Sequence, residues 1–131
     1  MHRYYINQII FSRTSSTDDN VVFESKHFPE LKMGIENKNE GFLTSKNEAL
    51  QHFRVVQGLC GEDGTISFES IAKSGYFLRH RGFKIFLDEW SDKDLFKKDS
   101  CFYPTYDENF EVRKLVFRFS KPNKLSFPIH M

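Results

Sequence analysis

The sequence contains no long apolar run and almost no net charge, and these two absences exclude several classes of protein. No window approaches the roughly 20 apolar residues of a membrane-spanning helix. The N-terminal segment holds only the short run Ile9-Ile10-Phe11, which is too short for a secretory signal. A net charge of +1 gives no electrostatic basis for binding nucleic acid or an anionic membrane. We therefore expect a soluble, intracellular protein, unless the chain is a mature form or a fragment of a longer one.

Cysteine is also scarce, with only Cys60 and Cys101. Two cysteines are too few for a disulfide-built scaffold. They can form a single bridge or remain as two buried thiols. Of the two arrangements, the thiols are the favoured interpretation.

Motifs that carry catalysis are absent from the sequence. It has no GxSxG, no GxGxxG, no phosphate-binding loop and no CxxC pair. No pair of carboxylates forms a recognisable acid/base motif. The five histidines show no metal-ligand spacing: His2, His27, His52, His80 and His130. The sequence therefore predicts a protein that is not an enzyme and that uses no metal and no cofactor.

Phenylalanine, by contrast, is abundant, with 15 of 131 residues. A small core can be filled by a few such large aromatic side chains. Apolar segments are short and are separated by Gly, Pro, Asn and Asp at close intervals, and no helical period persists for ten residues. Short strands at this spacing are typical of an all-β sandwich or barrel.

The triplet Phe-Glu-Ser occurs twice, beginning at Phe23 and Phe68, a spacing of 68 − 23 = 45 residues. An interval of 15 residues separates Phe53 from Phe68 and also Phe102 from Phe117. A fixed period of this size indicates a repeat architecture. It predicts three units, near residues 21–65, 66–114 and 115–131 with 1–20, within a single domain of residues 1–131.

Three units of about four strands predict a β-trefoil, since a propeller needs at least four blades. The third unit supplies only two strands, so we expect the N-terminal strand Tyr4 to Phe11 to complete it beside the C-terminal strands. Eleven of an ideal twelve strands are then accounted for. Phe23, Phe68 and Phe117 are expected in equivalent, buried positions.

The segment from Phe68 to Phe102 resembles the arabinofuranosidase B domain, a carbohydrate-binding module of family 42. The resemblance rests on FES, GYFLRHRGFKIFLD and LFKKDSCF, in that order. It is weaker over residues 21–56 and faint after Leu115. It implies a β-trefoil whose units can each hold a shallow pocket for a terminal arabinofuranose. In that family the hydrolase activity belongs to a separate catalytic domain.

The resemblance implies that His80, from LRHR, and Asp99, from LFKKD, contact the sugar. A carboxylate can accept hydrogen bonds from two vicinal hydroxyls, and an imidazole can donate or accept. Tyr76 or Trp90 can cover the apolar face of the ring. Structural roles remain open for the same residues: His80 as a core-side histidine, Asp99 as a brace for its turn, and Trp90 as a loop anchor. Arg79 and Arg81 are expected to pair with acids such as Asp88 and to orient the site.

The other two units depart from the family pattern. In the first, LKMGI replaces LRHR and Leu50 stands at the position of Asp99. In the third, Phe127 or Ile129 falls near the position of the histidine, unless a shift of one residue brings in His130. Within the second unit, Gly82 stands where the family has asparagine. We therefore expect at most one sugar pocket.

Two functions follow from the sequence. The first is a non-catalytic carbohydrate-binding module whose partner is an arabinofuranosyl-containing glycan. The alternative is an intracellular protein-interaction or structural β-trefoil that has lost sugar binding and binds an unidentified protein. Neither function involves nucleic acid or a membrane.

Overall fold

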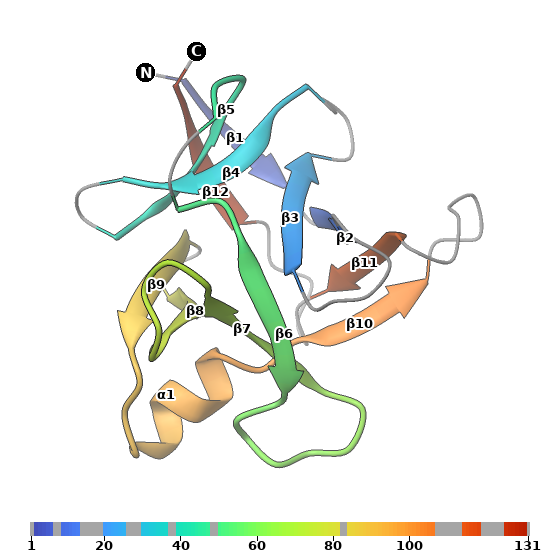
Figure 1. Cartoon of the computed structure of the whole chain (residues 1–131), viewed down its shortest axis with the longest axis vertical. Helices are drawn as coiled ribbons and strands as arrows, with labels where there is room; N and C mark the ends of the chain where they lie inside the picture. Colours follow the sequence, from blue (N-terminus) through green and yellow to red (C-terminus); the bar gives the residue numbers. More distant parts are fainter. Residues whose placement is uncertain are drawn as a thin grey trace.

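The computed structural model describes residues 2–6, 9–13, 20–25, 30–36, 39–47, 50–81, 84–106, 114–118 and 125–130 (Figure 1). Side chains are placed for residues 21–24, 30–36, 39–47, 50–81 and 84–102. The described strands are β1 (His2–Ile6), β2 (Ile9–Arg13), β3 (Asn20–Ser25), β4 (Lys32–Ile35), β5 (Gly41–Thr44), β6 (Phe53–Gln57), β7 (Ile66–Ser70), β8 (Tyr76–Arg81), β9 (Lys84–Glu89), β10 (Tyr103–Tyr106), β11 (Lys114–Arg118) and β12 (Leu125–His130). One helical turn and a half, α1 (Asp94–Asp99), follows β9. The all-β prediction is confirmed.

The N-terminal segment differs from the sequence prediction, which placed one strand from Tyr4 to Phe11. Two strands are present instead, because β1 ends at Ile6 and β2 begins at Ile9. They have different partners: β1 pairs with β12, whereas β2 pairs with both β11 and β3. The expected pairing with the C-terminal strands is present. The second N-terminal strand also brings the eleven expected strands to twelve.

Six of the strands form a closed circuit of antiparallel neighbours. The pairings run β2–β3, β3–β6 and β6–β7 on one side, and β10–β11 and β11–β2 on the other. The two halves meet where Ile66, at the start of β7, bridges Phe102, directly before β10. Closing a sheet on itself removes the exposed strand edges that otherwise favour aggregation.

The remaining six strands form three two-stranded units: β4 with β5, β8 with β9, and β1 with β12. These units meet one another, because β12 pairs in parallel with β5, and Glu40, next to β5, bridges Phe86 of β9. Strands β12 and β9 are also in contact. Each two-stranded unit therefore borders the other two.

Buried phenylalanines from neighbouring strands of the circuit, and from the residue directly before β10, form the centre of the core. Phe23, Phe53, Phe68 and Phe102 are each at most 1% exposed. The ring of Phe68 lies 4.9 Å from that of Phe23 and 5.4 Å from that of Phe102, centroid to centroid. The predicted burial of Phe23 and Phe68 is confirmed. The side chain of Phe117 lies outside the described residues, although its backbone occupies β11.

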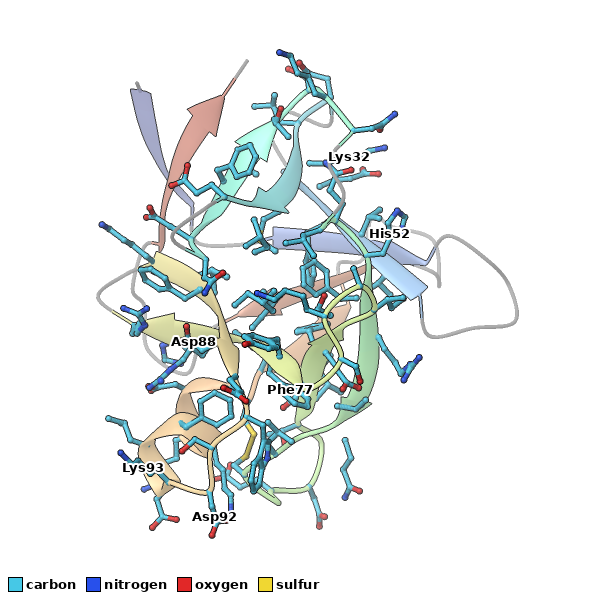
Figure 2. All side chains as sticks on the ribbon, turned by 60° about the vertical axis from the view of Figure 1, so that its left-hand side comes forward. Lys32, His52, Phe77, Asp88, Asp92 and Lys93 are labelled. Carbon is cyan, nitrogen blue, oxygen red and sulfur yellow. A yellow bond between two sulfur atoms is a disulfide. The ribbon has the colours of Figure 1, made fainter. Side chains whose placement is uncertain are left out.

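Cys60 and Cys101 form a disulfide, drawn in yellow beside α1 in Figure 2. The preference for two free thiols was therefore wrong. The bridge joins the β6–β7 loop to the residue two positions after α1, with a Cα–Cα distance of 6.1 Å. Their separation of 41 residues gave no local signal, since the two residues meet only after β7 pairs with the segment around Phe102.

No helix of the described residues is long and apolar enough to cross a membrane.

Candidate functional site

The β8–β9 hairpin carries most of the predicted site. The first half of β8 is aromatic and apolar, with Phe77 and Leu78 buried. Its second half is Arg-His-Arg, which is partly or fully exposed. Gly75 precedes the strand with φ of +86°, a conformation that favours glycine. Its carbonyl accepts a hydrogen bond of 2.9 Å from the backbone N–H of Trp90, which closes the open end of the hairpin.

Helix α1 brings Asp99 to the side of β8. The sequence DLFKKD places an acidic residue in the first turn and two lysines in the last, in keeping with the helix dipole. Phe96 is buried at 2% exposure and anchors the helix, which contacts β8. Asp92 and Lys93 mark the start of this segment at the bottom of Figure 2, below Asp88 of β9. Asp99 is the last residue of the helix.

The two motifs of the predicted site meet through an ion pair. Arg79 donates a hydrogen bond of 2.6 Å from Nη2 to Oδ2 of Asp99, and the two side chains are only 18% and 15% exposed. Asp88 was the expected partner of Arg79, and its Oδ2 lies farther away, 3.7 Å from Nη1 of Arg79. Arg81 donates to the same Asp88 oxygen at 3.2 Å. The charged contact between LRHR and LFKKD was missed by sequence reasoning, although both motifs had been assigned to one pocket.

His80 is half-buried beside this ion pair. Its ring lies 6.1 Å from that of Phe102, in an edge-to-face arrangement. Burial lowers the pKa of His80 below its ordinary value of 6.5, the negative charge of Asp99 opposes that shift, and Arg79 adds to it. At neutral pH the imidazole is therefore uncharged, with one nitrogen that donates and one that accepts. Asp99 is near enough for its charge to act on the pKa of His80, and its ion pair is with the neighbouring residue, Arg79.

We expect a pH titration to show this lowered pKa directly. The imidazole resonances of His80 should titrate with a midpoint below 6.5. The unfolded chain then binds this proton more readily than the folded chain. The contribution of His80 to the free energy of unfolding should therefore be constant above the pKa of the unfolded chain. It should fall as the pH drops from there toward the folded pKa. The variant His80→Gln should lose this component of the pH dependence, and a midpoint above 6.5 would contradict the prediction.

The two aromatic residues of the predicted site lie elsewhere on the hairpin. Tyr76 is four residues from His80 along β8, about 13 Å at the usual strand rise. The ammonium of Lys73 lies 4.2 Å from the centroid of the Tyr76 ring and covers one face of it. Trp90 follows Glu89, the cross-strand partner of Tyr76, and is 46% exposed. The structure therefore does not join Tyr76 and Trp90 to His80 and Asp99.

In the expected first unit, the residue that corresponds to Asp99 is part of the core packing. Leu50, which stands where the second unit has Asp99, is partly buried and packs against the core. The side chains of Phe127, Ile129 and His130 in the third unit, and the whole of Gly82, lie outside the described residues. Within the side chains that are placed, no group of three or more His, Cys, Asp or Glu residues has the geometry of a metal site.

Comparisons with known proteins agree with the motifs of this hairpin. The model of the family described as "Alpha-L-arabinofuranosidase B (ABFB) domain" matches residues 23–113. Among curated proteins, no match was found.

Two similar solved structures are a GH54 α-L-arabinofuranosidase soaked with a cyclic sulfate inhibitor and the E221Q mutant of such an enzyme soaked with 4-nitrophenyl α-L-arabinofuranoside. Each is 17% identical over 75% of this chain, with TM-scores of 0.53 and 0.52. This chain spans 19% of the length of either enzyme. The family match extends over more than two thirds of the sequence, and the chain therefore belongs to the α-L-arabinofuranosidase B domain family.

Proposed function

We propose that this chain is a non-catalytic carbohydrate-binding module that binds a terminal arabinofuranose in one pocket, formed by the second repeat. The observation that carries the proposal is that Arg79, the neighbour of His80 in β8, holds Asp99 of α1 in a hydrogen bond of 2.6 Å, so that the two motifs of the predicted site meet. Membership of the arabinofuranosidase B domain family supports the choice of sugar. The solved relatives are arabinofuranosidases of which this chain spans a minor part, and this supports a binding role rather than hydrolysis.

We further infer that the scaffold is a β-trefoil. The closed circuit supplies six barrel strands, and the three two-stranded units form a cap of three hairpin-like pairs. Each repeat then contributes two strands to each part: β3 to β6 for the first repeat and β7 to β10 for the second. The third consists of β11, β12, β1 and β2, joined across the two ends of the sequence. This assignment explains why β1 pairs with β12.

The chemistry of the pocket suits a small polyhydroxylated ring. Asp99 presents a carboxylate that can accept charge-assisted hydrogen bonds from neighbouring hydroxyls. The neutral His80 can donate a hydrogen bond to a hydroxyl or accept one from it. Contact of Tyr76 or Trp90 with the apolar face of the sugar ring stays a prediction.

We expect Asp99→Ala to abolish binding of methyl α-L-arabinofuranoside, because the charged acceptor of the pocket is removed. For the wild type, the dissociation constant should be on the order of millimolar to tens of micromolar, since a small ligand in a shallow site gains limited energy per atom. Amide chemical shifts recorded during the sugar titration give both the affinity and the location. Perturbations should centre on His80 and the C-terminal end of α1.

Asp92→Ala is the matched control. It removes the same charged group, from an exposed ion pair with Lys97 just before α1, and should leave binding unchanged. Leu50→Ala should also bind normally provided that it folds. Absence of any perturbation near His80 at high sugar concentration would refute sugar binding and favour the protein-interaction role. Perturbations confined to the first or third repeat would show that the pocket lies in that repeat and that its assignment to the second repeat is wrong.

A further inference from the structure

Arg79 occupies an unusual position for a strand arginine. Its two terminal nitrogens point to two different carboxylates, with Nη2 at 2.6 Å from Asp99 and Nη1 at 3.7 Å from Asp88. Its guanidinium also lies over the ring of Phe96, 5.2 Å from the centroid. Arg79 therefore connects three elements, since Asp88 belongs to β9 and both Phe96 and Asp99 belong to α1.

The third nitrogen of the same guanidinium is buried without a partner. Nε of Arg79 has no hydrogen bond among the described residues. An unsatisfied buried donor is unfavourable and is uncommon in folded proteins. The orientation of the side chain thus allows the ionic contacts of the two terminal nitrogens and the contact with the Phe96 ring, and it leaves Nε without a hydrogen bond. Of its two ionic contacts, the one with Asp99 is the shorter by more than 1 Å.

We propose that Arg79 is the positioning residue of the sugar pocket: it holds Oδ2 of Asp99 and thereby fixes the direction in which this carboxylate accepts hydrogen bonds from a ligand. This inference rests on the proposed function and assigns a role to a residue that does not itself touch the sugar. The oxygen that Arg79 holds is Oδ2. In this proposal the other oxygen, Oδ1, is the one that accepts from the sugar hydroxyls.

The role depends on the planar guanidinium. Nη2 is held in a fixed plane toward Asp99 while the flat face of the group rests on Phe96, and the longer contact with Asp88 is not needed for this. A lysine has a single ammonium on a flexible stem and cannot reproduce this arrangement. Without the planar guanidinium, the Asp99 side chain is free to populate several staggered rotamers and must be ordered again when sugar binds.

The test compares two variants of Arg79 and one control variant of Asp88. Each is titrated with methyl α-L-arabinofuranoside, and binding is followed by amide chemical shifts. Arg79→Met keeps most of the apolar stem and removes the guanidinium. Arg79→Lys keeps the positive charge. We expect both to bind about three- to tenfold more weakly than the wild type, because the loss lies in ordering Asp99 and not in net charge. Urea melts of each variant establish that binding is measured on folded protein.

Asp88→Asn is the control that separates positioning of Asp99 from bracing of the hairpin. It removes the other carboxylate partner of Arg79, together with that of Arg81, and should leave the affinity close to that of the wild type. The proposal is overturned if Arg79→Lys binds as the wild type does, or if Asp88→Asn weakens binding as much as Arg79→Lys. Should Arg79→Met fail to fold, the lysine and asparagine variants decide the question by themselves.

The outcomes also separate this inference from the proposed function. Wild-type binding that is lost in Asp99→Ala but unchanged in both Arg79 variants would refute the positioning role alone. A wild-type protein that binds no sugar would refute the proposed function and the role of Arg79 together. An additional readout is the pKa of His80, which Arg79 lowers. It should rise in Arg79→Met and stay close to the wild-type value in Arg79→Lys, even though both variants lose affinity.

Discussion

The substitution Phe68→Ala should reduce the free energy of unfolding by about 3–5 kcal/mol, the usual range for truncating a fully buried phenylalanine. Phe68 has no exposed surface, and its ring packs against those of Phe23 and Phe102 in the centre of the core. Neighbouring strands that are closed into a circuit have little freedom to collapse into the space that the ring vacates. Urea denaturation of the wild type and the variant gives the difference.

Phe86→Ala is a matched control within the same fold. Phe86 lies in β9, is only partly buried, and has Arg81 stacked over its ring at 3.4 Å. Its truncation should be clearly less destabilising. The same measurement extends to Phe23 and Phe117, the other residues expected at this position of the repeat. If two of the three alanine variants were as stable as the wild type, the threefold arrangement of the core would be refuted.

The expected second repeat, residues 66–114, shows how much of such a fold the sequence can predict. Turn residues on both sides of its apolar segments predict strands from Ile66 to Ser70, Tyr76 to His80 and Phe83 to Asp88, and these bounds lie within a residue of those of β7, β8 and β9. The same reasoning predicts a short turn of helix from Asp94 to Ser100, where α1 is found. Local signals were sufficient there because a Gly, Ser or Asp stands within two residues of each segment boundary.

The N-terminal segment gave no such signal. Its residues YYINQIIF are apolar or aromatic on both sides of Asn7-Gln8, with no glycine or proline between them. What distinguishes β1 from β2 is the pairing partner of each, β12 for one and β11 with β3 for the other. Of those partners, β11 and β12 lie more than a hundred residues away in the sequence, so a local pattern cannot reveal the division.

The candidate site was predictable only in part, because some of its contacts are local in the sequence and others are not. His80 and Asp99 belong to motifs of one repeat, and both lie at the contact between β8 and α1. The aromatic residues were harder to place. A strand rises about 3.3 Å per residue, and Tyr76 lies at the opposite end of β8 from His80. The partner of Arg79 depends on how α1 packs on β8, which the residues around Arg79 do not encode.

The disulfide is expected to contribute about 2–4 kcal/mol to stability. Linking residues 41 positions apart reduces the chain entropy of the unfolded state, by about 4 kcal/mol in the simplest model. The variant with Cys60→Ala and Cys101→Ala should therefore show a lower urea midpoint than the wild type. Reduction of the wild type with dithiothreitol should give nearly the same midpoint, because it removes the same link without changing other residues.

The proposed sugar pocket should tolerate loss of the bridge better than the fold does. The segment that follows Asp99 is also held by a hydrogen bond of 2.6 Å from Ser67 Oγ to the carbonyl of Ser100 and by the backbone pair of Ile66 and Phe102. These contacts keep Asp99 beside Arg79 while the protein remains folded, so sugar affinity should change little in the double alanine variant. Thiol titration of the unfolded, unreduced wild type should detect no free cysteine. Detection of two free thiols, with a urea midpoint unaffected by reductant, would show that the bridge does not form in solution.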